Sequence, residues 1–162
     1  MEVRYKRLVD NAKAPFQKYK DDYCWDLYAT SCEEIAPNIY RYELGMAIEM
    51  QRDLEKILFN GSNICVPLDK SYCKLCLHLF PRSSVWETGM VLANTPGVVD
   101  EPYRGGIAAI FYHVNKEMPI YKVGDRVCQC SLGISLPIEW KEVQELNDGE
   151  RGENGFGSTG KE

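Results

Sequence analysis

Apolar and polar residues alternate along much of the chain. Between Tyr40 and Met50 the even-numbered positions are apolar, and odd positions carry charged residues such as Arg41, which predicts one strand with one buried face. The run Ile107–Val114 is apolar on both faces, and Val127–Ile134 alternates again after a Gly-Asp turn. A period of two is typical of strands, and a run that is apolar on both faces is typical of a strand between two layers. The pattern predicts an all-β domain of short strands joined by turns rich in Gly and Pro.

One segment departs from this period. Met50, Leu54, Ile57 and Leu58 are spaced as one face of a helix, and Asn60-Gly61 follows as a stop signal. We therefore predict a short inserted helix within an excursion that spans about residues 52–72.

Composition narrows the class of protein. The 162 residues are 44% hydrophobic, which is enough for one packed domain and excludes wholesale disorder. The net charge of −5 and a pI near 5.2 argue against a nucleic-acid partner, because a duplex is gripped through its phosphates. Apolar runs fall well short of the ~18 residues of a spanning helix, and the N-terminus has no signal-peptide pattern. We expect a cytoplasmic protein with no membrane partner.

The seven cysteines allow two interpretations. Their odd number and the missing secretory signal argue against a disulfide framework. Cys65, Cys73, Cys76 and His78 are zinc-ligand types at close spacing. However, a strand over Tyr72–Phe80 would point Cys73 and Cys76 to opposite faces, and no second pair completes a zinc site. Buried thiols are the favoured interpretation, and zinc is the alternative.

Three segments carry candidate chemistry. Pro81-Arg82-Ser83-Ser84 offers a cation, two hydroxyls and turn amides, which suit phosphate oxygens. The turn from Ala93 to Asp100 contains an Asn whose amide could read the edge of a nucleobase. The segment 101–106 then places a carboxylate, an aromatic ring and an Arg close together.

The C-terminal segment changes character. Residues 147–162 are acidic and then rich in Gly, with Arg151 and Phe156 among them. Such a segment cannot bury enough apolar surface to fold alone. It is either a frayed tail or a lid that closes over an anionic ligand containing a ring. We therefore divide the chain into a domain over residues 1–146 and a flexible arm over residues 147–162.

Taken in order, five segments resemble the motifs of the trimeric dUTPase family, including phage-type members that also read Pro-Arg-Ser-Ser. They are Asp26–Ala29, Pro81–Ser84, Asn94–Gly105, Gly124–Gln129 and Arg151–Gly160. The resemblance implies a jelly-roll-like homotrimer with active sites shared between subunits. It also implies Mg²⁺-dependent hydrolysis of dUTP to dUMP and pyrophosphate, in the cytoplasm or in the host cytoplasm if the protein is phage-encoded.

The resemblance also implies a role for individual residues. Asp100 matches the base that activates water for attack on the α-phosphate, and Asp26 matches a carboxylate that holds hydrated Mg²⁺ through water. Asn94 and the backbone that follows match the uracil-reading hairpin, and Tyr103 matches the ring that packs on deoxyribose. The implied substrate-binding residues are Arg82, Ser83, Ser84, Asn94, Gly97, Val98, Val99, Tyr103, Gln129, Arg151, Phe156, Gly157 and Ser158.

Two other functions are alternatives. A dCTP deaminase on the same fold would use a glutamate as base, whereas this hairpin carries Asp100. A regulatory protein that binds dUTP with little turnover would follow if the unusual Tyr23-Cys24-Trp25 before Asp26 disabled the metal site.

Overall fold

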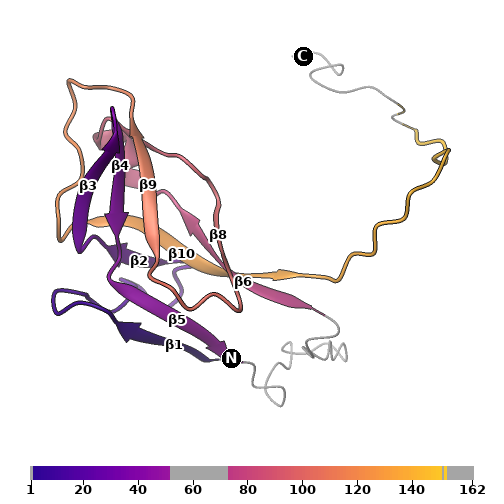
Figure 1. Ribbon diagram of the computed structural model, residues 1–162, viewed down its shortest axis with the longest axis horizontal. Coiled ribbons are helices and arrows are strands. Elements are labelled where there is room, and N and C mark those ends of the chain that lie inside the picture. The colour runs from indigo at the N-terminus through magenta and orange to yellow at the C-terminus, as the bar shows by residue number, and fades with distance from the viewer. Residues whose placement is uncertain (1, 52–72, 151, 153–162) are drawn as a thin grey trace.

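The computed structural model describes residues 2–51, 73–150 and 152, and nearly all of its regular structure is strand. The strands form three antiparallel sheets, ordered β1-β5, β2-β10-β6-β8 and β3-β4-β9-β7 (Figure 1). The predicted all-β class is confirmed. The elements are β1 Glu2–Arg7, β2 Trp25–Tyr28, β3 Ser31–Ala36, β4 Ile39–Glu43, β5 Met46–Gln51, β6 Lys74–Phe80, the 3-10 helix η1 Ser83–Glu87, β7 Met90–Leu92, β8 Gly97–Asp100, β9 Ala108–His113 and β10 Arg126–Ser135.

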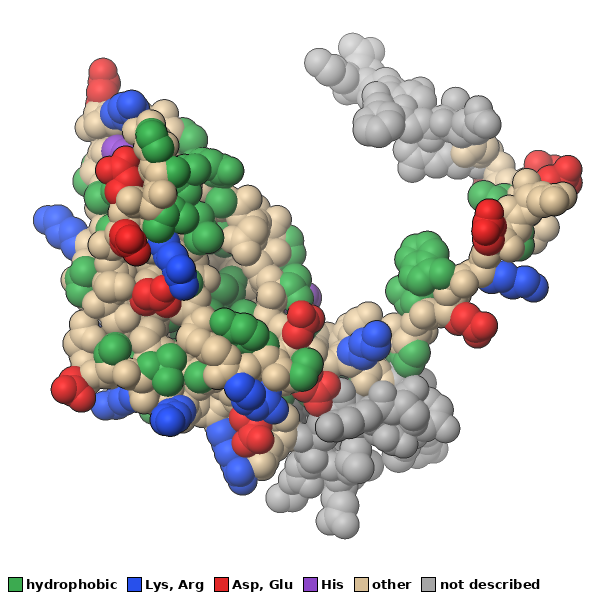
Figure 2. Space-filling view, viewed as in Figure 1, with side chains coloured by type: hydrophobic (Ala, Val, Ile, Leu, Met, Phe, Trp, Pro, Cys, Tyr) green, Lys and Arg blue, Asp and Glu red, His purple; other side chains and the backbone are tan. Residues whose placement is uncertain are grey.

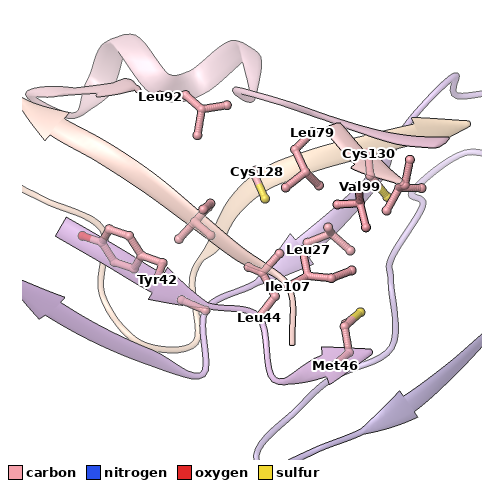
Figure 3. Packing of buried hydrophobic residues seen from close by; sticks show 14 of the residues in the cluster. Leu27, Tyr42, Leu44, Met46, Leu79, Leu92, Val99, Ile107, Cys128 and Cys130 are labelled. Carbon is pink, nitrogen blue, oxygen red and sulfur yellow. The ribbon is translucent and has the colours of Figure 1, made fainter. Parts of the chain in front are cut away.

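One apolar cluster joins the three sheets. Alternate residues of strands such as β5 and β6 point inward, and every sheet contributes residues to the cluster (Figure 3). Tyr42 of this cluster has no exposed surface, and its hydroxyl donates a hydrogen bond to the carbonyl of Tyr121 at 3.0 Å. Members from the different sheets include Leu27, Tyr42, Met46, Leu79, Leu92, Val99, Phe111 and Cys128.

The prediction of one continuous strand from Tyr40 to Met50 is wrong, although the predicted buried face is right. The segment is two strands in different sheets, β4 and β5, separated by Leu44 and Gly45. Gly45 has a φ of +66°, a left-handed conformation that redirects the chain without ending the alternation. Leu44 therefore stays buried even though it lies between the strands.

The predicted helix cannot be followed in full. Met50, its expected first apolar residue, belongs to β5 and pairs with Val3 of β1. The remainder of the helix, and the excursion over 52–72, lie outside the described residues. No helix in the described part of the chain is long and apolar enough to cross a membrane.

Of the described cysteines three are buried and three are partly exposed, and the candidate zinc ligand Cys65 lies outside the described residues. Cys73 immediately precedes β6 and is buried, whereas Cys76 lies on β6 and is partly exposed. Within residues 2–51 and 73–150, no group of three or more His, Cys, Asp or Glu side chains could hold a metal ion. Cys128 and Cys130 of β10 are both buried.

The chain after β10 extends away from the sheets (Figure 1). The apolar side chains of this segment are exposed to solvent (Figure 2). We call residues 136–146 the C-terminal strap. Its exposed apolar residues are Leu136, Ile138, Trp140, Val143 and Leu146.

The turn at Gly45 gives a stability prediction. A Cβ at Gly45 would lie 2.5 Å from Thr30 Cγ2 and 2.8 Å from Val9 Cγ2, which are both steric clashes. The left-handed φ of this residue is a second source of strain for any other side chain. We expect Gly45→Ala to lower the free energy of unfolding by about 1–3 kcal/mol, measured by urea denaturation at fixed protein concentration. The control is Gly124→Ala, where φ is +92° but no atom lies within 4 Å of the added Cβ. An equal loss in the two variants would contradict a steric role for the contacts around Gly45.

Candidate functional site

Asp26 lies between two guanidinium groups. Its Oδ1 accepts a hydrogen bond from Arg82 Nε at 2.8 Å, and its Oδ2 accepts one from Arg126 Nη1 at 2.9 Å. The Asp26 side chain is 16% exposed, which reduces the screening of both ion pairs by water. The interactions join β2, the turn after β6 and the start of β10, which are far apart in sequence.

The turn after β6 is fixed by side chains of the same region. Arg82 also donates from Nη1 to Ser84 Oγ at 3.1 Å, within the Arg82–Ser84 turn that leads into η1. Gln129, which lies opposite Asp26 on β10, donates from Nε2 to the carbonyl of Pro81 at 2.8 Å. Arg82, Ser83, Ser84 and Gln129 were expected to contact phosphate, and the structure brings them to the same place.

All of these residues except Ser84 line a cavity of about 580 Å³, which we call the phosphate cavity. Its lining includes Asp26, Arg82, Ser83 and Gln129. It also includes residues to which the sequence assigned no role, namely Phe16, Lys18, Asp22, Tyr23, Cys24 and Arg126. Arg126 stands inside a recognised motif, so its position was a usable signal. Phe16 lies outside every motif, and only the fold brings it here.

Asn94, Gly97, Val98, Val99, Asp100 and Tyr103 line a different cavity, of about 280 Å³, which we call the hairpin cavity. It lies along β8, an edge strand of its four-stranded sheet. The outer backbone groups of an edge strand have no strand to pair with, so they are available to hydrogen-bond a planar ligand. The amide Nδ2 of Asn94 lies 3.3 Å from the position of a Cβ on Gly97, which places that amide beside the same strand.

The ring of Tyr103 is held over a glycine. Its hydroxyl donates to the carbonyl of Gly106 at 2.9 Å, and a Cβ on Gly105 would collide with the ring. The side chain is 46% exposed and lines the hairpin cavity, so it offers a fixed aromatic surface to a ligand. Arg41 of β4 lines this cavity too and was not identified from the sequence.

Asp26 and Asp100 project from the same sheet face but lie far apart. Asp26 is opposite Gln129, which is opposite Phe80, whereas Asp100 is opposite Cys76. Opposed residues of antiparallel strands point to one side, so both carboxylates project from the face turned away from the core. The three strand spacings from β2 to β8 correspond to about 14 Å, and the offset from Phe80 to Cys76 to about 13 Å. The two carboxylates of one chain are therefore separated by about 20 Å.

The thiol in the phosphate cavity is not an activated nucleophile. Burial, and next the negative charge of Asp26, raise the pKa of the Cys24 thiol. Burial also raises the pKa of the neighbouring Cys130 to about 12. Both thiols are therefore protonated at neutral pH, and a thiol is a much weaker nucleophile than a thiolate. The site is better suited to binding an anion and directing water.

The remaining predicted residues cannot be placed. Arg151, Phe156, Gly157 and Ser158 lie outside the described residues. The division at residue 146 falls within the described extended chain that follows β10, and nothing in this geometry tests it.

The chain is similar to dUTPases over nearly its full length. Residues 10–160 match the family model described as dUTPase. The chain is 32% identical over 161 residues to the deoxyuridine 5'-triphosphate nucleotidohydrolase of Clostridium novyi, covering 99% of each protein. It is 31% identical over 162 residues to the enzyme of the same name from Wolinella succinogenes, covering 99% of this chain and 95% of that protein.

Solved structures share the fold. The dUTPase of Staphylococcus bacteriophage 80alpha, solved with dUpNHpp, superposes with a TM-score of 0.71 at 21% identity, covering 98% of each chain. A mutant dUTPase of the Staphylococcus aureus phage phi11 gives a TM-score of 0.66 at 15% identity, covering 91% of this chain and 100% of that one. The fold inferred from the order of the motifs is thereby confirmed. The sequence matches and the family model together show that the chain belongs to the dUTPase family.

Proposed function

We propose that this chain hydrolyses dUTP to dUMP and pyrophosphate by attack of water on the α-phosphate. The observation that carries the proposal is the phosphate cavity, where motifs one, two and four converge through Asp26, Arg82 and Gln129. The relatives named as deoxyuridine 5'-triphosphate nucleotidohydrolases support the reaction. The phage 80alpha dUTPase solved with dUpNHpp supports a deoxyuridine nucleotide as ligand.

In this proposal the phosphate cavity neutralises and orients the triphosphate. Hydrolysis at the α-phosphate needs positioning and charge neutralisation more than covalent chemistry from the protein. Arg82 is already oriented by Asp26, and the hydroxyls of Ser83 and Ser84 lie in the same turn. Their geometry is set before the ligand arrives, so little ordering is needed on binding.

The hairpin cavity supplies the base and the specificity. Asp100 accepts the proton of the attacking water. Asn94 and the outer edge of β8 hydrogen-bond the uracil ring, and the close backbone leaves no room for a 5-methyl group. Tyr103 packs on the deoxyribose, where a 2'-hydroxyl would collide with the ring. The fixed Tyr103 ring and the edge position of β8 support these roles.

Magnesium is the proposed cofactor, and the donor set around Asp26 suits an indirect role for the protein. Each Asp26 oxygen accepts one guanidinium hydrogen bond, which leaves a second acceptor direction on each for the water shell of a hydrated ion. When bound, the ion would neutralise phosphate charge. The phage phi11 dUTPase is described with a structural Mg(II) ion.

The separation of the two cavities supports a homotrimer with shared sites. Reacting groups must approach to about 3–3.5 Å, so Asp100 and the phosphate cavity of one chain, about 20 Å apart, cannot serve one phosphorus atom. The hairpin of a second copy would complete each site. The C-terminal strap supports association as well, because its apolar side chains are largely exposed on a single chain.

The two alternative functions would give different results with dUTP and dCTP. A dCTP deaminase would release ammonia from dCTP, and a regulatory protein would bind dUTP with little turnover. Incubation with dUTP or dCTP and Mg²⁺, followed by assays for pyrophosphate and ammonia, separates the three functions. The proposed function requires pyrophosphate from dUTP and no ammonia from dCTP.

The role of Asp100 is tested by Asp100→Asn. The amide keeps the size of the side chain but cannot take up the proton of water at neutral pH, so we expect kcat to fall by ~10²-fold or more. Binding of dUpNHpp, measured by calorimetry, should persist. The control is Asp10→Asn, at an exposed position outside both cavities. Turnover near the wild-type rate in Asp100→Asn would exclude this residue as the base.

Assembly is tested through the strap. Light scattering should give about three times the chain mass of 18.5 kDa. Burial of a large apolar side chain contributes about 1.5–3 kcal/mol, so Trp140→Ala should raise the concentration at which the oligomer dissociates by about 10-fold or more. The matched control is Lys141→Ala, at the next strap position. A monomeric, fully active wild-type protein would contradict the shared site, and equal dissociation of the two variants would exclude the Trp140 side chain from the contact.

A further inference from the structure

The charges around the phosphate cavity point beyond the residues assigned from the motifs. Asp26 bonds both Arg82 and Arg126, so one carboxylate cancels one of the two guanidinium charges. Lys18 and Asp22 also line the cavity and offset each other. The cavity therefore has a net charge of +1 with Arg126 and of zero without it. An anion as charged as a nucleoside triphosphate needs that remaining charge.

Arg126 is held on an aromatic ring that no motif contains. The carbon of its guanidinium lies 5.5 Å from the centroid of the Phe16 ring, a cation–π distance. Phe16 is fastened to β2 by two backbone hydrogen bonds with Asp26, of 2.9 and 2.7 Å. Asp26 therefore binds Arg126 through its carboxylate, and through its backbone it holds Phe16, whose ring lies under the Arg126 guanidinium.

The orientation leaves donors of Arg126 free for a ligand. Among the described residues its guanidinium makes one hydrogen bond, from Nη1 to Asp26. A guanidinium carries five N–H donors in a planar fork, and this fork matches the oxygens of a phosphate. The side chain is 37% exposed and lines the cavity.

We propose that Arg126, positioned by the Phe16 ring and by Asp26, is a further phosphate-binding residue of this site. This inference rests on the proposed function for the identity of the triphosphate but not for its anionic character. Asp26 thereby has a positioning role toward two cations, in addition to its proposed role toward hydrated Mg²⁺.

The test uses inorganic tripolyphosphate with the full-length protein, in EDTA so that no divalent ion contributes. Calorimetry should show that Arg126→Gln weakens tripolyphosphate binding by about 10-fold or more, and that Arg126→Lys recovers part of the loss. Phe16→Leu keeps an apolar contact but removes the aromatic face. It should weaken binding about two- to fivefold, the equivalent of about 0.5–1 kcal/mol. The control is Lys116→Gln, an exposed charge in a turn outside the cavity.

Asp26→Asn distinguishes phosphate binding from a purely structural role. If Arg126 served only to hold Asp26, loss of either partner would weaken tripolyphosphate binding alike. The proposal predicts unequal effects: Asp26→Asn loosens Arg126 but raises the cavity charge by one, so it should weaken binding less than Arg126→Gln, which removes a positive charge. In the dUTP reaction, Arg126→Gln should raise KM more than it lowers kcat. Thermal melting of each variant checks that the fold is intact.

Two results would overturn the proposal. One is tripolyphosphate binding by Arg126→Gln that equals wild type, and the other is no binding by the wild-type protein. A wild-type protein that binds tripolyphosphate through Arg126 but does not hydrolyse dUTP would contradict the proposed function alone.

Discussion

The width of one four-stranded sheet separates the two chemical halves of this protein. β2 and β8 are the two edges of the same sheet, so the carboxylates of Asp26 and Asp100 share a face while lying about 20 Å apart. Core packing fixes this separation, because alternate residues of the intervening β10 and β6 are buried in the apolar cluster. Under the proposed function, the phosphate cavity and the hairpin cavity of a single chain are therefore too far apart to act on one phosphate. Association of copies is the simplest way to bring the two together.

The residues that line the phosphate cavity have a net positive charge, although the chain as a whole is negatively charged. The chain has a net charge of −5, yet Arg82 and Arg126 converge on one partly buried carboxylate. Local placement outweighs net charge here, since partly buried groups are screened less than those on the surface. Because Asp26 bonds both guanidinium groups, its negative charge cancels one of their two positive charges. Under the proposed role of Arg126, its guanidinium supplies the positive charge that remains for an anionic ligand.

The sequence predicted the parts of this structure that depend on local pattern or on motif order. The even-numbered residues from Tyr42 to Met50 are buried, as the period of two predicts. The motifs predicted that Asp26, Arg82 and Gln129 belong to one site, and all three line the phosphate cavity. The break at Gly45 was missed because a left-handed glycine changes the direction of the chain without changing the hydrophobic period.

The position of Phe16 could not have been predicted. Its contact with Arg126 depends on a backbone pairing with Asp26 that has no sequence signature. The pairing of Asp26 with two guanidiniums is likewise a product of three elements that meet only in the fold. Contacts between single side chains that are far apart in the sequence could therefore not be predicted from the sequence.

Subunit complementation tests the shared site most directly. Asp100→Asn damages the hairpin cavity and Arg82→Gln damages the phosphate cavity, so each pure variant should be nearly inactive. Co-refolding equal amounts of the two variants should restore activity, because roughly a quarter of all sites in the mixture would combine an intact phosphate cavity from one chain with an intact hairpin from another. Activity of the mixture that stays at the level of the two pure variants, although mixed trimers form, would contradict a site shared between chains.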